Sequence, residues 1–97
     1  MKLLVAACAV CMFLSCVKDP DHHVRVRNLS EHPITILIDD TIRFDSIAVQ
    51  QKSVYKSIQE GSHQVGGDYF GNFVVEGTGT HKWTIEILDD GMNLVED

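Results

Sequence analysis

From residue 24 onward the sequence consists of short segments in which apolar and polar residues alternate, separated by turn-forming residues. The alternation is clearest in residues 24–29 and 82–88. A period of two is typical of a β-strand with one face in water and the other in a core. The nearest helical candidate, residues 50–59, fits a strand about as well, and no stretch keeps a helical period for about twelve residues. The sequence therefore predicts an all-β fold.

The spacing of the predicted strands indicates their arrangement. About seven short strands at intervals of about ten residues favour a small antiparallel β-sandwich, immunoglobulin-like or transthyretin-like, or a partly open barrel. We expect turns at Asp39-Asp40-Thr41, at residues 60–62 and at Asp89-Asp90-Gly91, the last within a hairpin. The strands are predicted at residues 24–29, 34–38, 42–44, 53–58, 69–76, 82–88 and 92–95, with a brief edge strand at 63–65.

Residues 82–88 also indicate which side chains form the core. Their alternation predicts that Trp83, Ile85 and Ile87 point inward. A domain of roughly 75 residues buries about 60–65% of its unfolded surface, so its stability should be modest. If the Trp83 ring is buried, replacement by alanine should cost about 3–5 kcal/mol.

The N-terminal segment has a different character. An apolar run extends from Leu3 to Leu14, and the small residue Ser15 precedes Cys16. This order is typical of an export signal, which we expect at residues 1–15. A membrane anchor is one alternative, but the run covers only roughly 18–20 Å of a hydrocarbon core about 30 Å thick. Cleavage before Cys8 is another, and it would leave an apolar stretch of only about five residues.

The segment Phe13-Leu14-Ser15-Cys16 resembles the lipobox of bacterial lipoproteins. The resemblance implies cleavage before Cys16, transfer of diacylglycerol to its thiol, and acyl chains such as palmitate that hold the protein at the outer membrane. It divides the chain into a signal peptide, a lipidated tether at residues 16–23 and a domain at residues 24–97. Since Cys8 and Cys11 lie in the signal, the mature domain would have no disulfide and no cysteine metal site.

Charge narrows the range of partners. The formal net charge is −6, and a negative surface opposes both nucleic acid and anionic lipid headgroups. We therefore expect no nucleic-acid partner, and membrane contact only through the lipid anchor. Lys18, Asp19 and Asp21 resemble the lysine-plus-acid export tag of surface-exposed Bacteroidetes lipoproteins, although a proline interrupts the acids. The tag implies cell-surface exposure, with a periplasm-facing domain as the alternative.

Four segments of the domain carry a wider resemblance. They are Val24-Arg25-Val26-Arg27-Asn28, Phe44-Asp45-Ser46-Ile47, Ser53-Val54-Tyr55-Lys56-Ser57 and Lys82-Trp83-Thr84-Ile85-Glu86-Ile87. Together they resemble a family of small Bacteroidetes lipoproteins of unknown function, over most of residues 23–97. The resemblance implies location and a compact β domain, and it brings no catalytic residues.

The histidines are candidate metal ligands. The most suggestive group is Asp21-His22-His23, because short histidine-rich tracts can hold transition metals. Adjacent histidines on a linker nevertheless lack a fixed geometry and supporting hydrogen bonds. We therefore predict a solvated linker there, surface positions for His63 and His81, no metal site and no cofactor.

Catalytic candidates are equally sparse. The Asp39-Asp40 and Asp89-Asp90 pairs lack the spacing of a calcium loop, and aspartate is a common turn residue. There is no Gly-x-Ser-x-Gly nucleophile motif, and the glycines do not form a phosphate-binding loop. The sequence predicts no catalytic residues and a protein that is not an enzyme.

Recognition is the remaining class of function. Tyr69, Phe70 and Phe73 lie in a glycine-flanked stretch, where an outward aromatic ring could stack on a sugar or fill a pocket of a partner. The competing interpretation places all three in the core. Exposed sheet edges could also accept a partner strand. We predict a non-catalytic binding or accessory module of the cell envelope that recognises protein or glycan; the alternatives are a structural lipoprotein without a soluble ligand and a small hydrolase.

Overall fold

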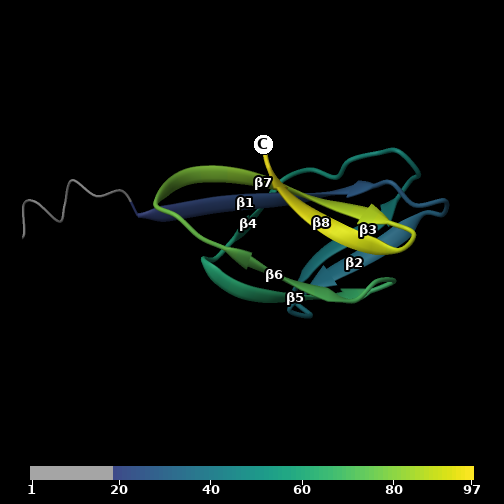
Figure 1. Cartoon of the computed structure of the whole chain (residues 1–97), viewed down its shortest axis with the longest axis horizontal. Coiled ribbons are helices and arrows are strands. Elements are labelled where there is room, and N and C mark those ends of the chain that lie inside the picture. Colours follow the sequence, from purple (N-terminus) through teal and green to yellow (C-terminus); the bar gives the residue numbers. More distant parts are fainter. Residues whose placement is uncertain (1–18) are drawn as a thin grey trace, which may run out of the picture.

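The computed structural model describes residues 19–97, which form a β-sandwich of eight strands (Figure 1). The predicted all-β sandwich is therefore confirmed. These residues include no helix, and so none long and apolar enough to cross a membrane. The strands are β1 (Pro20–Asn28), β2 (Ile34–Ile38), β3 (Ile42–Ile47), β4 (Lys56–Ile58), β5 (Gly61–Gly67), β6 (Gly71–Val75), β7 (Gly79–Leu88) and β8 (Gly91–Glu96).

The strands divide into two four-stranded sheets, with the orders β4-β1-β7-β8 and β3-β2-β5-β6. In an immunoglobulin-like sandwich the first two strands share a sheet. Here β1 and β2 lie in different sheets, so the strand order is not the immunoglobulin-like one. One strand pair departs from the expected antiparallel pattern, because β1 runs parallel to β7 from Pro20 opposite Gly79 to Asn28 opposite Ile87.

The first strand begins earlier than the sequence predicts. The alternation indicates a start at residue 24, whereas β1 starts at Pro20, so residues 20–23 belong to the sandwich and not to a tether. Proline is tolerated at the first position of a strand. His22 occupies the inward position two residues before Val24. Because histidine is polar, the alternation of apolar and polar residues does not show that the strand extends this far back.

The core lies between the two sheets. Ile85 and Ile87 are fully buried, as predicted, and Trp83 is half-buried with its ring packed against the core. The expected cost of Trp83→Ala accordingly lies below the range for a fully buried ring. The buried apolar residues are Val24, Val26, Ile34, Ile36, Ile38, Phe44, Ile47, Ile58, Val65, Phe73, Val75, Ile85 and Ile87. All of these residues lie after Asp19, within the part of the chain that the structure describes.

The segment between β3 and β4 is neither a helix nor a long strand. It runs beside β1, where Ser53 N–H donates to the carbonyl of Val26 at 2.8 Å and Ser53 Oγ accepts from Val26 N–H at 2.9 Å. The predicted strand at residues 53–58 is reduced to the three residues of β4. Isolated hydrogen bonds to β1 thus hold this segment against the sheet, although it does not pair with β1 as a continuous strand.

Two of the three predicted turns form, both at aspartate pairs; at the third, residues 60–62, Gly61 and Ser62 already belong to β5. Asp39 and Asp40 join β2 to β3 with φ angles of 54° and 59°, a conformation that aspartate tolerates. Asp89 and Asp90 join β7 to β8 in the predicted hairpin. Gly67 has φ 92°, and a Cβ atom there would lie 2.5 Å from the carbonyl oxygen of Thr35.

The strand directions define two ends of the molecule (Figure 1). One end, called here the proximal end, contains Pro20, the start of β7 and the end of β6. The distal end contains the β7–β8 turn and the connection from β5 to β6, residues 68–70. The proximal end is where residues 1–18 join the domain, and the distal end lies one strand length away.

Candidate functional site

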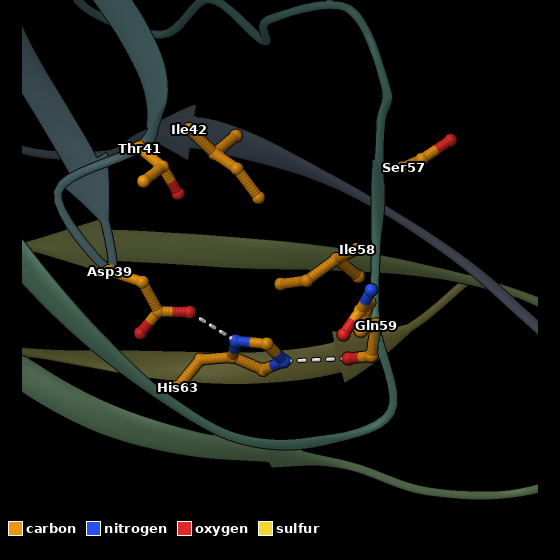
Figure 2. A pocket seen from close by; sticks show the side chains of 7 residues that line it. All are labelled: Asp39, Thr41, Ile42, Ser57, Ile58, Gln59 and His63. Atoms are coloured by element: carbon orange, nitrogen blue, oxygen red, sulfur yellow. Dashed lines mark hydrogen bonds and ion pairs between the residues drawn. The ribbon is translucent and has the colours of Figure 1, made fainter.

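An open cavity lies between the β2–β3 turn, β4 and the start of β5 (Figure 2). His63 forms one wall and is only 8% exposed. Its Nδ1 atom lies 2.5 Å from Oδ2 of Asp39, and its Nε2 atom lies 2.6 Å from the carbonyl oxygen of Gln59. The lining residues are Asp39, Thr41, Ile42, Ser57, Ile58, Gln59 and His63.

The hydrogen-bond partners of His63 occupy both of its ring nitrogens. A carboxylate oxygen of Asp39 lies against one nitrogen and the Gln59 carbonyl oxygen lies against the other. Asp39 Oδ1 also accepts the N–H of Gln64 at 2.9 Å. That backbone hydrogen bond, followed by the one from His63, holds the pKa of the Asp39 carboxyl below its usual value. The pair fastens the β2–β3 turn to β5.

This cavity has the residues of a hydrolytic site but not the geometry. A general base needs a nitrogen within reach of a substrate proton, and both nitrogens of His63 already contact protein oxygens, those of Asp39 and Gln59. Figure 2 shows the Ser57 hydroxyl pointing away from the ring. The Asp39–His63 pair is therefore a structural link, and it gives no support to the hydrolase alternative.

A second histidine cluster lies at the proximal end, in the sheet that contains β1. His22 is 2% exposed, and its Nε2 atom donates to the carbonyl of Gly77 at 3.0 Å. Its Nδ1 atom accepts from Nε1 of Trp83 at 3.1 Å. These two roles fix a neutral ring protonated on Nε2.

His81 stacks on His22 with ring centroids 5.2 Å apart. Its Nδ1 atom lies 2.6 Å from Glu96 Oε2, and its Nε2 atom lies 2.7 Å from the carbonyl oxygen of Thr78. The Glu96 carboxylate, followed by the Thr78 carbonyl, raises the pKa of the His81 imidazole above its usual value. The His81 ring with this raised pKa thus stacks on the buried His22 ring.

The structure corrects the predicted positions of two histidines. His22 is buried in β1 instead of solvated in a linker, and His63 is buried instead of exposed. Among residues 19–97 no group of three histidine, cysteine, aspartate or glutamate side chains is placed to hold a metal ion. Extending the period-two pattern of β1 back by one step would have placed His22 inward. No local pattern reveals that Asp39 reaches His63.

The three predicted aromatic residues have three different environments. Phe73 is 6% exposed and belongs to the core, and Tyr69 is half-buried against it. Phe70 is 84% exposed at the distal end. The interpretation that places all three in the core is wrong for Phe70, because the turn between β5 and β6 turns its ring outward.

The surroundings of Phe70 are polar. One shallow pocket beside the ring extends to Gln64 and Asn72, and a second extends to Asp39 and Asp40. All four of these side chains are exposed. An apolar ring is therefore surrounded by amides and carboxylates that can exchange hydrogen bonds with a bound molecule.

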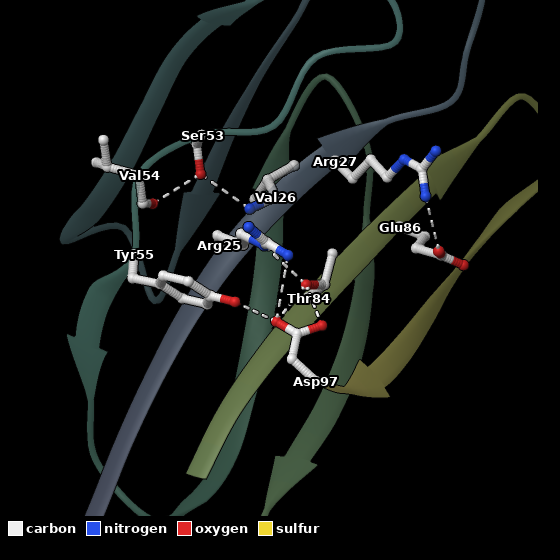
Figure 3. Close-up of polar contacts among 9 residues, drawn as sticks. All are labelled: Arg25, Val26, Arg27, Ser53, Val54, Tyr55, Thr84, Glu86 and Asp97. Carbon is white, nitrogen blue, oxygen red and sulfur yellow. Dashed lines mark hydrogen bonds and ion pairs between the residues drawn. The ribbon is translucent and has the colours of Figure 1, made fainter. Parts of the chain in front are cut away.

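The outer face of the β1–β7 sheet carries a polar network (Figure 3). Arg25 lies 4.6 Å above the Tyr55 ring centroid, and its Nη2 atom is 3.5 Å from Asp97 Oδ2. The Tyr55 hydroxyl and Thr84 Oγ1 both donate to Asp97. Partial burial opposes ionisation of Asp97, but these hydrogen bonds and Arg25 lower its pKa, while the bond to Asp97 raises the pKa of Tyr55. These contacts tie Asp97, which follows β8, to Arg25 of β1 and Thr84 of β7.

The predicted lipid-attachment residue Cys16 and the tag residue Lys18 lie outside the described residues. Of the other tag residues, Asp19 is exposed, and Asp21 lies in β1 where it accepts from Thr80 Oγ1 at 3.2 Å. Comparisons with protein-family models and with curated proteins find no match for this chain.

Proposed function

We propose that this chain is a lipid-anchored, non-catalytic binding module of the bacterial cell envelope, which recognises a protein or glycan through the surface around Phe70. The observation that carries the proposal is the 84% exposure of Phe70. A phenylalanine side chain that is this exposed contributes little to packing of the core, and aromatic side chains are enriched where proteins bind partners.

The lipobox resemblance of residues 13–16 supports the anchor, and the strand directions support the placement of the binding surface. An anchor at Cys16 would hold the proximal end toward the outer membrane. Phe70 lies at the distal end, so its ring would face away from the bilayer, toward a partner.

The polar groups beside Phe70 suit either class of ligand. A sugar ring can stack its apolar face on the phenyl ring while Gln64 and Asn72 bond its hydroxyls. A protein partner could instead cover the ring in an apolar pocket, with the amides at the rim. In either case Phe70 supplies the apolar contact.

The test is capture of a partner by the full lipoprotein from solubilised native envelope, in parallel with binding to immobilised cell-wall and surface glycans. We expect a stoichiometric partner or glycan retention that survives moderate salt and is lost in Phe70→Ala. Val54→Ala is the matched control, because Val54 is 72% exposed in the connection between β3 and β4.

Two results would contradict the proposal. Equal capture by the Phe70→Ala variant would remove Phe70 from the binding surface. No specific capture at all would favour the structural lipoprotein. The anchor is tested separately by the intact mass of protein from native membranes, where Cys16→Ala should abolish both the cleavage and the added acyl chains.

A further inference from the structure

The four edge strands of the sandwich lie on two sides of the molecule. On one side β3 and β4 are close, because Lys56 on β4 donates to the carbonyl of Arg43 and lies 5.1 Å from the Phe44 ring centroid. On the other side β6 and β8 are close, because a Cβ atom at Gly71 would lie 2.6 Å from the sulfur of Met92.

The β3–β4 side is protected against the addition of another strand. β3 carries the exposed charges of Arg43 and Asp45, and its pairing with β2 shifts register where Ser46 has a φ of 47°. β4 is only three residues long and begins with Lys56. Charge, irregularity and short length are the features by which proteins prevent edge-to-edge pairing.

The β6–β8 side lacks these features. β6 has no charged residue, and neither do residues 91–95 of β8. Val74 is 49% exposed and Val95 is 41% exposed on these two strands. The uncharged stretches are residues 69–75 and 91–95, because Glu76 follows β6 and Glu96 ends β8. In a chain with a net charge of −6, these stretches are where two copies can approach with less repulsion.

The outward side chains along β6 form a self-complementary row. Phe70, Asn72 and Val74 are exposed and alternate with the buried Phe73 and Val75. If a second copy pairs antiparallel with Asn72 opposite Asn72, then Phe70 of each copy lies opposite Val74 of the other. Apolar side chains face apolar ones and amide faces amide, which are favourable cross-strand pairs.

We infer that this chain pairs with a second copy of itself through β6, so that two four-stranded sheets join into one continuous sheet. The open edge of β6 supplies backbone hydrogen bonds, and the row of Phe70, Asn72 and Val74 sets the register. Phe70 belongs to both this row and the proposed binding surface, so the pairing is tested at Asn72 and Val74 and the binding surface at Phe70, and each can fail without the other.

Crosslinking tests the pairing and the register together. Residues 19–97 contain no cysteine, so Asn72→Cys introduces a single thiol into this part of the chain. Opposed residues of antiparallel strands have Cα atoms about 4.5–5.5 Å apart, a separation that a disulfide can bridge. Under mild oxidation this variant should form a covalent dimer, and Ser57→Cys, an exposed position on β4, should remain monomeric.

Sedimentation equilibrium gives a second readout. The domain of residues 19–97 should approach twice its monomer mass as concentration rises, and Val74→Lys should weaken the dimer by about tenfold or more. Val54→Lys makes the same change at a more exposed valine on the opposite side and should leave the dimer unchanged. Equal melting temperatures of the two lysine variants show that folding is retained.

A domain that stays monomeric up to about 1 mM, or equal crosslinking of Asn72→Cys and Ser57→Cys, would overturn the inference.

Discussion

Asn28 organises the connection from β1 to β2 with a single side chain. It is fully buried, and its Nδ2 atom donates to the carbonyls of His32 at 2.7 Å and Ile47 at 2.9 Å. Its Oδ1 atom accepts from the N–H and the hydroxyl of Ser30 at 2.9 and 2.6 Å. Every polar position of the amide is therefore used, and its hydrogen bonds to Ile47 and Ser30 are buried.

Replacement of Asn28 by alanine should cost about 3 kcal/mol of unfolding free energy, because several buried polar groups lose their partner. Urea denaturation followed by Trp83 fluorescence measures this change. The matched control is Asn93→Ala, an exposed amide on β8 that should change stability by less than about 0.5 kcal/mol. Similar midpoints for the two variants would show that the Asn28 hydrogen bonds contribute nothing net to stability.

The pair of His81 and Glu96 makes a residue-scale prediction about pH. The folded-state pKa of His81 is raised above 6.5 by the Glu96 carboxylate and the Thr78 carbonyl. The stabilisation from charged His81 is therefore fully present below about pH 6.5 and is lost as pH rises through the folded-state pKa. The wild type should lose stability relative to His81→Gln over that rise.

NMR titration of the His81 ring provides the direct measurement. Glu96→Gln should move the His81 pKa back toward its usual value, since the carboxylate is the larger cause of the shift. An unchanged pKa in Glu96→Gln would assign the shift to some other group.

At the scale of elements, Gly67 controls how closely β5 can approach β2. Its φ is 92°, and a Cβ atom on it would lie only 2.5 Å from the Thr35 carbonyl oxygen, so a larger residue requires a backbone shift. Gly67→Ala should destabilise the domain by about 1–3 kcal/mol, measured as a shift in thermal midpoint.

The neighbouring glycine supplies the control for that change. A Cβ atom at Gly66 would meet only the carbonyl oxygen of Leu37, at 3.9 Å, which is ordinary contact. Gly66→Ala should therefore be close to neutral. If both variants were equally destabilised, the cause would be glycine flexibility in the β5–β6 connection and not the contact with Thr35.

The elements differ in how far local sequence predicts them. Alternation identifies β2 and β7 because Ile34, Ile36, Ile38, Ile85 and Ile87 all occupy inward positions. Alternation misses the first residues of β1, where a buried histidine takes the place of an apolar residue. It also predicts a strand at residues 53–58 that is longer than β4. In both cases the deciding contacts come from distant residues such as Gly77, whose carbonyl accepts from His22, and Val26, which bonds Ser53.

At the scale of the whole molecule, strand order and the candidate site depend on pairing between segments far apart in the sequence. The parallel pairing of β1 with β7 joins residues about sixty positions apart, and no local pattern distinguishes it from antiparallel pairing. Likewise, the glycine-flanked aromatics predict a binding residue, but the sequence cannot show that Phe70 is exposed while Phe73 is in the core. The exposure of Phe70 and the burial of Phe73 both depend on the turn between β5 and β6 at the distal end.

The start of β1 at Pro20 shortens the proposed tether and makes the last prediction. Three residues lie between Cys16 and Pro20. The four steps along the chain from Cys16 to Pro20 span at most about 14 Å when fully extended. In the lipidated protein the proximal end should therefore lie against the bilayer, with the distal end about 30 Å farther out, the length of a nine-residue strand. A bulky maleimide should react several-fold more slowly with Thr78→Cys than with Asp90→Cys in intact membranes, and equally after detergent solubilisation. Equal rates in membranes would mean that the domain stands away from the bilayer despite its short connection.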